Sequence, residues 1–519
     1  MKALSVLYAG ALAPEAFAPV PGAGGKSAFA LALEKAGQFP GTSKLVLLGA
    51  GDTEYRGAPP ESGSFAIIRQ TEWKKSSLLE QLARLSAGYD FAYYAWADCP
   101  FLDPVLAGKE AGRHLAYAAE YSYADGWPYG FAPELLSPGT AAILSKILGG
   151  DDGPVERDSI FQVLQKDINS FDIETEIAPV DLRLYRLTLA ADSKRNLLLA
   201  GRLMEAGLKG AGDIGELIEK KPGLLRSLPA FFPVQVFSRC PQSCSLCPYP
   251  RFGGETGNAG EAMGVEKFTT LLDKIIAFSG DGVIDLSLWG ELSLHPQKIE
   301  IAGAVLDRKE LSLVIETSGL GWKESELECL AEKAAASPKR TNSLCPDPLS
   351  WIVSLDAANP ERYREVRGAG FAEASGCAKK LSALFPASLY VQALRVQGAE
   401  DDIEQFYRYW NSQSGARVII QKYDNFCGAL PQLEATDLSP LKRQPCWHIM
   451  RDMPVLLDGS VPFCREDLAA LKTGGAPGNV FSGPLEEIWE RSSALYLEHA
   501  RSVYPGICKE CDEYYTYNF

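Results

Sequence analysis

The stretch Cys240-Pro-Gln-Ser-Cys244-Ser-Leu-Cys247 places three thiols in one short loop. Three thiolates can hold three irons of a [4Fe-4S] cube and leave the fourth iron open to a small molecule. A zinc knuckle is the structural alternative, but structural zinc takes four protein ligands, and no further Cys or His stands near enough in sequence to complete such a site. The stretch therefore predicts an iron–sulfur loop with one open iron.

The sequence around this loop predicts an α/β fold. Apolar runs alternate with helical patterns and form six βα units, which make an incomplete (β/α)6 barrel. In such a barrel, reactive groups gather at the carboxyl ends of the strands. The expected strands are residues 234–237, 283–289, 311–316, 351–355, 389–395 and 417–422.

Polar motifs follow three of these strands: Leu288-Trp289-Gly290-Glu291, Glu316-Thr317-Ser318-Gly319 and Ser354-Leu355-Asp356-Ala357. Together with the CxxxCxxC loop, they resemble the motifs of the radical S-adenosylmethionine (SAM) superfamily. The resemblance implies that the open iron chelates SAM and that an electron from the cube cleaves its sulfonium, which gives a 5′-deoxyadenosyl radical. It also implies a set of cofactor-binding residues: Gly290 and Glu291 at the SAM ammonium group, and Ser318 and Ser354 at its ribose and carboxylate.

The chain departs from the superfamily pattern at two positions. Trp289 replaces the first glycine of the usual pair, and Leu246 stands where an aromatic residue usually precedes the last cluster cysteine. The downstream Arg364 and Arg367 are candidates to pair with a carboxylate of substrate or cofactor, with solvated or salt-bridged arginines as the alternative.

The C-terminal part of the chain contains a second set of thiols. Cys446, Gly459 and Cys464 stand in the pattern C-x12-G-x4-C, Cys508 and Cys511 form a CxxC pair, and one helix is expected over 484–500. This set resembles the twitch domain, the short form of the SPASM domain, and the resemblance implies an auxiliary [4Fe-4S] cluster. A Zn(Cys)4 ribbon is the alternative. Four thiolates leave no open iron, which favours electron transfer.

Cys427 lies just beyond the sixth expected strand, where a catalytic hydrogen-atom donor to a substrate radical would stand. A small packing cysteine in a loop is the alternative.

The first part of the chain resembles nucleotidyltransferases with a glycosyltransferase-A-like α/β sandwich fold. A glycine-containing loop follows the first expected strand, and Ala97-Asp98-Cys99-Pro100 ends a later one. The resemblance implies that Asp98 binds a divalent metal, that Lys26 meets a phosphate, and that Asp192 is a second acidic position. The Gly-x-Gly-x-Arg element of this class is missing, so three possibilities stay open: a degenerate substrate-binding domain, an active transferase, or an unrelated α/β fold.

Taken over its whole length, the chain resembles the spiro-SPASM proteins. We therefore expect three domains: a nucleotidyltransferase-like domain over 1–220, a radical SAM partial barrel over 230–440 and a twitch/SPASM-like domain over 441–519.

Composition limits the setting of this protein. The chain has 519 residues, 46% of them hydrophobic, and a formal net charge of −15, which argues against binding nucleic acid through phosphate neutralisation. Cysteines in metal-ligand spacings favour a reducing compartment. The apolar residues 1–18 are expected to begin with a first β-strand, and a secretory leader is the alternative interpretation. We expect a cytoplasmic protein that contacts neither nucleic acid nor membrane.

The expected activity is that of a radical SAM enzyme that abstracts hydrogen from a peptide or protein, or from a nucleotide-linked or glycan-related small molecule. Its expected partners are this substrate and an electron donor such as flavodoxin or ferredoxin. Two alternatives stay open: a non-catalytic iron–sulfur electron-transfer or assembly protein, and a bifunctional nucleotidyltransferase–radical SAM enzyme.

Overall fold

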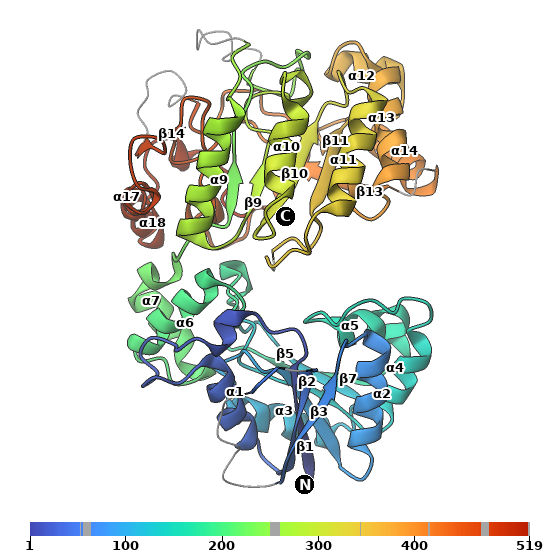
Figure 1. Cartoon of the computed structure of the whole chain (residues 1–519), viewed down its shortest axis with the longest axis vertical. Coiled ribbons are helices and arrows are strands. Elements are labelled where there is room, and N and C mark those ends of the chain that lie inside the picture. Colours follow the sequence, from blue (N-terminus) through green and yellow to red (C-terminus); the bar gives the residue numbers. More distant parts are fainter. Residues whose placement is uncertain are drawn as a thin grey trace. The chain divides into compact units, whose positions relative to one another are not determined.

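The computed structural model describes residues 1–51, 53–55, 64–249, 260–342, 344–413, 416–468 and 477–516. The chain divides into two compact units, Met1–Ser227 (unit 1) and Leu228–Phe519 (unit 2). Each is an α/β structure built on a largely or wholly parallel sheet, with unit 1 blue to green and unit 2 green to red in Figure 1.

The described part of unit 1 forms a seven-stranded sheet in the order β3-β2-β1-β4-β6-β5-β7. Neighbouring strands are parallel except where β6 pairs with β4 and β5. Its strands are β1 (Ala3–Ala9), β2 (Thr42–Ala50), β3 (Ser64–Gln70), β4 (Phe91–Trp96), β5 (Tyr121–Asp125), β6 (Glu134–Leu136) and β7 (Ile173–Ile177). Its helices are α1 (Ala28–Gly37), α2 (Lys75–Ser86), α3 (Pro104–Ala116), α4 (Thr140–Ile147), α5 (Ser159–Leu164), α6 (Lys194–Glu205) and α7 (Ile214–Lys220).

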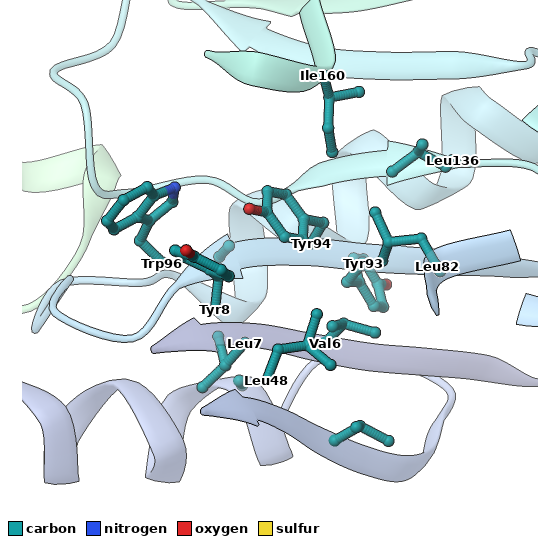
Figure 2. Close-up of a cluster of buried hydrophobic side chains, with 14 of the residues drawn as sticks. Val6, Leu7, Tyr8, Leu48, Leu82, Tyr93, Tyr94, Trp96, Leu136 and Ile160 are labelled. Atoms are coloured by element: carbon teal, nitrogen blue, oxygen red, sulfur yellow. The ribbon is translucent and has the colours of Figure 1, made fainter. Parts of the chain in front are cut away.

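The core of unit 1 explains why its apolar start is a strand. Every residue of β1 is buried, and β1 lies between β2 and β4 inside the sheet. Strands covered on both faces are expected to be continuous apolar runs, as in Val6-Leu7-Tyr8. Figure 2 shows these side chains packed against Leu48 of β2 and Tyr94 of β4.

The residues of unit 2 that the structure describes form a six-stranded sheet in the order β13-β12-β11-β10-β9-β8, in which every pairing is parallel. Its strands are β8 (Phe231–Pro233), β9 (Gly282–Asp285), β10 (Leu311–Thr317), β11 (Leu349–Ser354), β12 (Leu389–Arg395) and β13 (Arg417–Lys422). Sequential order and parallel pairing require a crossover between each strand and the next, and these crossovers contain helices packed on the sheet (Figure 1). The helices are α9 (Val265–Ser279), α10 (Lys298–Leu306), α11 (Glu324–Ala336), α12 (Pro360–Val366), α13 (Phe371–Leu384) and α14 (Glu400–Gln413).

Four of the six expected strands lie within two residues of their predicted bounds, and the second, expected over 283–289, ends at Asp285. The first begins three residues early, at Phe231, and pairs with β9 only as far as Pro233. The same stretch also pairs with a C-terminal segment: Gln235 donates its amide to Val455 (2.9 Å), and Val455 donates to Pro233 (2.8 Å). The apolar run at 234–237 is therefore bonded both to the C-terminal segment and to other parts of unit 2, since Val234 donates to Asp285 (2.7 Å) and Val236 accepts from Met263 (2.9 Å).

The C-terminal segment belongs to the same compact unit as the six-stranded sheet. Its described residues contain α15 (Trp447–Arg451), the antiparallel pair of β14 (Ser460–Val461) and β15 (Gly478–Asn479), and the short helices α17 (Leu485–Arg491) and α18 (Ser493–Ala500). The single helix expected over 484–500 is thus interrupted at Ser492, whose hydroxyl donates to the carbonyl of Trp489 (2.8 Å) and competes with the helical ladder. Among the described residues, no helix combines the length and hydrophobicity needed to cross a membrane.

Candidate functional site

The loop after β8 brings Cys240, Cys244 and Cys247 together as free, partly buried thiols. Burial raises the pKa of Cys240 to about 12 and that of Cys247 to about 11, and neighbouring thiols add to both shifts. The charged thiolate forms of these cysteines repel one another, which places the three sulfurs close together. A bound metal offsets this repulsion, because thiolates are the form that binds iron and binding releases their protons. The set therefore fits a cluster that takes three protein ligands.

The cysteine loop is fixed to the strand ends by a buried polar network that sequence reasoning missed in part. Arg367 forms an ion pair with Asp356 (2.7 Å) and donates to Gln242 Oε1 within the loop (3.1 Å). Gln242 in turn donates to the hydroxyl of Tyr363 on α12 (2.8 Å). The Arg367 guanidinium also acts against the rise in the pKa of Cys244 that burial causes. Arg367 is thus a salt-bridged support of the thiol loop.

Gly290 follows β9 at a point where no larger residue fits. A Cβ at Gly290 would lie 1.7 Å from the carbonyl oxygen of Phe237, so the two backbone segments touch. The preceding Trp289 has a φ of +47°, the left-handed conformation that glycine adopts without cost. Gln235 holds this conformation by donating to the Trp289 carbonyl (2.9 Å). The tryptophan in place of the usual glycine therefore keeps a glycine-like backbone.

Glu291 is a buried carboxylate held by the end of β10. It accepts hydrogen bonds from the hydroxyl of Thr317 (2.6 Å) and the backbone amide of Ser318 (2.8 Å). Burial raises its pKa, and these hydrogen bonds act in the opposite direction. Its charge also contributes to the raised pKa of Cys240. The backbone amide of Ser293 is a further, longer donor (3.4 Å), so most of the roughly four acceptor positions of this carboxylate are already taken by the protein.

Ser354 belongs to a second polar cluster, at the ends of β10, β11 and β12. Its hydroxyl donates to Glu316 Oε1 (2.8 Å), and the side-chain amide of Gln392 donates to the same oxygen (3.0 Å). Ser318 accepts a hydrogen bond from the amide of Leu320 (3.3 Å) and stands beside Glu291. The strand order brings these groups to one edge of the sheet. Gln392 belongs to no recognisable sequence motif, so the sequence contains no signal for its place in this cluster.

The C-terminal thiols Cys446, Cys464, Cys508 and Cys511 also gather. Burial raises the pKa of Cys446, and Cys511 and Cys508 add to that shift. The backbone amides of Glu466 and Glu513 point at the sulfurs of Cys464 (3.5 Å) and Cys511 (3.4 Å). Such amides stabilise sulfur that carries negative charge. The donor set fits an iron–sulfur cluster and also a tetrahedral zinc.

Gly459 supplies the turn that this thiol set requires. Its φ is +94°, and a Cβ there would lie 2.2 Å from the ring of Phe481. The amide of Val480 donates to the Gly459 carbonyl (2.8 Å), which holds the residue after β15 against the turn before β14. Steric constraint thus explains why glycine occupies this position of the C-x12-G-x4-C pattern.

Cys427 lies against the C-terminal thiols. Its thiol donates a hydrogen bond to Cys511, and this bond raises the pKa of Cys427 and lowers that of Cys511. Cys427 has a φ of +53° and follows Phe426 at +52°. Cys427 and the CxxC pair lie at opposite ends of the C-terminal segment in the sequence, so no spacing rule indicates that they are in contact.

Apolar side chains join the two thiol groups. Leu246, which precedes Cys247, packs in one cluster with Phe426 and Tyr423 of the loop that carries Cys427. Phe426 also packs on Trp289 with ring centroids 5.7 Å apart. Apolar packing around a cluster limits water access and tunes its potential.

In unit 1, Asp98 follows β4 and is fully buried. The Arg157 guanidinium lies 2.6 Å from Asp98 Oδ2 and 3.1 Å from Asp192 Oδ2. The structure thus brings the two predicted acidic positions together, through an arginine that the sequence did not indicate. Lys26, the predicted phosphate contact, pairs with Glu34 of α1 (2.6 Å), and both side chains are exposed.

The sequence comparisons identify relatives of this chain. No known protein-family model matches it. A protein of Treponema pallidum (strain Nichols), described as uncharacterized, is 39% identical over 367 residues, which cover 69% of this chain and 98% of that protein. The chain belongs to the family of this Treponema protein. A second protein of the same organism, also described as uncharacterized, is 27% identical over 139 residues, 24% of this chain and 64% of that protein.

Several solved structures also resemble parts of this family member. Streptococcus suis SuiB bound to the precursor peptide SuiA has a TM-score of 0.40 and 14% identity, over 55% of this chain and 71% of SuiB. BtrN in complex with AdoMet and 2-DOIA has a TM-score of 0.36 and 18% identity, over 55% and 94%. A cytidylyltransferase from Leptospira borgpetersenii serovar Hardjo-bovis (strain JB197) has a TM-score of 0.35 and 15% identity, over 43% and 95%. At these scores the similarities carry no argument about function.

Proposed function

We propose that unit 2 is a radical SAM enzyme, with the SAM-binding [4Fe-4S] cluster on Cys240, Cys244 and Cys247. The proposal is supported chiefly by one observation: three thiols of one loop lie close to the buried carboxylate of Glu291. That loop contains no fourth cysteine. When bound, the cluster would supply an electron to SAM and so produce the 5′-deoxyadenosyl radical that abstracts hydrogen from a substrate.

The residues around the thiols have distinct tasks in this proposal. Glu291 accepts the SAM ammonium group while Thr317 and Ser318 hold its carboxylate in place. The tight passage of Gly290 over Phe237 fixes the backbone that carries Glu291. Ser354 and Ser318 offer hydroxyls to the remaining polar groups of SAM, and the Glu316–Gln392 pair orients Ser354.

The C-terminal thiols Cys446, Cys464, Cys508 and Cys511 are proposed to hold an auxiliary [4Fe-4S] cluster that relays electrons. Their four sulfurs leave no open iron, which suits electron transfer and not direct substrate binding. The contact of Cys427 with Cys511 favours a role for Cys427 at this cluster. Its role as a hydrogen-atom donor to substrate remains a prediction.

The substrate class and the electron donor are carried forward as proposals from the sequence. The substrate is a peptide or protein side chain, or a nucleotide-linked or glycan-related small molecule. A small redox protein such as flavodoxin or ferredoxin supplies the electron, and no nucleic acid or membrane partner is proposed. The domain division at 1–220, 230–440 and 441–519, the membership of the spiro-SPASM proteins and a cytoplasmic location belong to the same proposal.

The test is anaerobic formation of 5′-deoxyadenosine by the reconstituted full chain with dithionite and SAM. Reactions receive either the small-molecule or the macromolecular fraction of a cell lysate, and the fraction that stimulates product identifies the substrate class. Cys240→Ala is expected to abolish the product. Cys329→Ala, a change on α11 outside both thiol sets, is the matched control and should retain it.

Absence of 5′-deoxyadenosine from wild-type protein that carries both clusters, in every fraction, would contradict the proposal. The non-catalytic electron-transfer or assembly alternative would then replace it, because that class binds clusters without cleaving SAM.

A further inference from the structure

The resemblance of unit 1 to nucleotidyltransferases requires a divalent metal at Asp98, and Asp192 is the second expected ligand. Magnesium takes oxygen ligands at about 2.0–2.1 Å and keeps near-octahedral geometry. The two carboxylates do converge, as that class requires. However, one oxygen of each carboxylate, Asp98 Oδ2 and Asp192 Oδ2, faces the same nitrogen of Arg157.

Arg157 binds Asp98 in a bidentate manner. One guanidinium nitrogen donates to Asp98 Oδ1 (3.2 Å) and the other to Asp98 Oδ2 (2.6 Å). The guanidinium also lies over the rings of Trp96 (4.5 Å) and Tyr129 (5.2 Å), and its first nitrogen donates to the Tyr129 hydroxyl (3.3 Å). The Arg157 guanidinium is planar and permanently charged, and it is held by both oxygens of one carboxylate and by two aromatic rings. It is therefore a fixed part of the site.

Burial makes this arrangement hard to exchange for a metal. The side chain of Asp98 is 1% exposed, that of Asp192 10% and that of Arg157 25%. Moving the guanidinium away would leave two carboxylates close together without their cation, and removing one partner of a buried ion pair is strongly destabilising. Asp192 is further held by the side-chain amide of Asn196 (2.7 Å). Both acids are therefore satisfied without a metal.

We infer that Arg157 occupies the metal position of unit 1, so that this unit takes no divalent cation at Asp98 and transfers no nucleotidyl group. The acids that resemble metal ligands instead form a buried Asp98–Arg157–Asp192 ion-pair cluster. This inference excludes the bifunctional alternative and leaves unit 1 as a metal-independent domain. It does not depend on the chemistry proposed for unit 2, so either can fail alone.

The test is Mn²⁺ binding to the full chain, measured as free Mn²⁺ by room-temperature electron paramagnetic resonance. Wild type and Asp98→Asn are expected to bind the same amount. Arg157→Gln removes the resident cation and is expected to gain one site that binds Mn²⁺ at least tenfold more tightly than wild type. The double variant Asp98→Asn/Arg157→Gln should lose it.

Arg183→Gln is the matched control, because Arg183 also joins two carboxylates, Asp125 and Asp181, but is 61% exposed. It should gain no tight site. An Asp98-dependent Mn²⁺ site in the wild type would overturn the inference, and so would a folded Arg157→Gln variant that gains none.

If Arg157→Gln does not fold, crystals of the wild type grown with Mn²⁺ decide the matter by anomalous scattering. No manganese peak beside Asp98 supports the inference, and a peak in contact with Asp98 overturns it. Asp98-dependent release of pyrophosphate from a nucleoside triphosphate by the wild type would overturn it as well.

Discussion

At the scale of single residues, the candidate site of unit 2 depends on groups that are each satisfied before any cofactor arrives. Glu291 holds three backbone or hydroxyl donors, and Ser354 is oriented by Glu316 and Gln392. Trp289 and Asp356 take left-handed backbone conformations, with φ of +47° and +56°. Strain of this kind is maintained only where surrounding contacts fix it, and it gathers at functional sites.

Glu291→Gln tests the proposed contact with the SAM ammonium group. The amide keeps the size of the carboxyl but removes its charge, and a hydrogen bond to a charged group contributes about 1.5–3 kcal/mol. We expect SAM to bind roughly tenfold to a hundredfold more weakly, with unchanged iron content. Equilibrium binding of SAM to the reconstituted protein measures this. Glu300→Gln, an exposed glutamate on α10, should change nothing, and equal affinity of the two variants would remove the assignment.

Gly290→Ala tests the close backbone contact with Phe237. A methyl group 1.7 Å from a carbonyl oxygen forces the backbone to move, and overpacking of this type costs about 1–3 kcal/mol or more. The variant should melt at lower temperature and bind less iron. Gly376→Ala, inside α13 with open space around it, should instead stabilise by about 0.5–1 kcal/mol. Similar melting curves for the two variants would contradict this account.

At the scale of elements, the segment after α15 behaves as an added partner of β8. Met453 and Val455 donate their amides to Phe231 (2.9 Å) and Pro233 (2.8 Å), and Ala230 donates to Arg451 (2.9 Å). Lys422, at the end of β13, forms ion pairs with Asp512 (2.7 Å) and Glu513. The C-terminal thiols are therefore attached at both edges of the sheet.

Hydrogen exchange tests this attachment. The amides of 451–457 should exchange as slowly as those of β9, because both sets are bonded to the same sheet. The largely exposed stretch 436–441 should exchange far faster and serves as the internal control. Exchange of 451–457 at the rate of 436–441 would mean that the C-terminal segment is a separate, loosely attached domain.

The elements also show what the sequence can and cannot predict. Ligand spacings are local, so Cys240, Cys244 and Cys247 were recognisable in one loop, and the apolar periodicity located four of six strands to within two residues. Contacts between distant residues follow no spacing rule. Arg157 meets Asp98 across 59 positions and Gln242 meets Arg367 across 125, and the pairing of 234–235 with Val455 is likewise non-local.

At the scale of the whole molecule, two compact units divide at Ser227 and Leu228. The large buried cluster of unit 1 draws only on its own residues, which is the condition for independent folding. Fragments 1–227 and 228–519 should each fold, as judged by cooperative thermal melts. Only fragment 228–519 should bind iron, and its iron content per chain should equal that of the full protein. Iron bound by 1–227, or an unfolded 228–519, would contradict this division.

The most direct test of the central proposal is the paramagnetic resonance spectrum of the reduced cluster with and without SAM. The variant Cys446→Ala/Cys464→Ala removes half of the auxiliary thiols, so that the remaining signal belongs to the loop cluster. The account predicts a [4Fe-4S] signal whose g-values shift when SAM is added and which disappears when Cys240→Ala is introduced. A signal that saturating SAM leaves unchanged, or one that survives Cys240→Ala, would show that this loop does not hold an open-iron cluster.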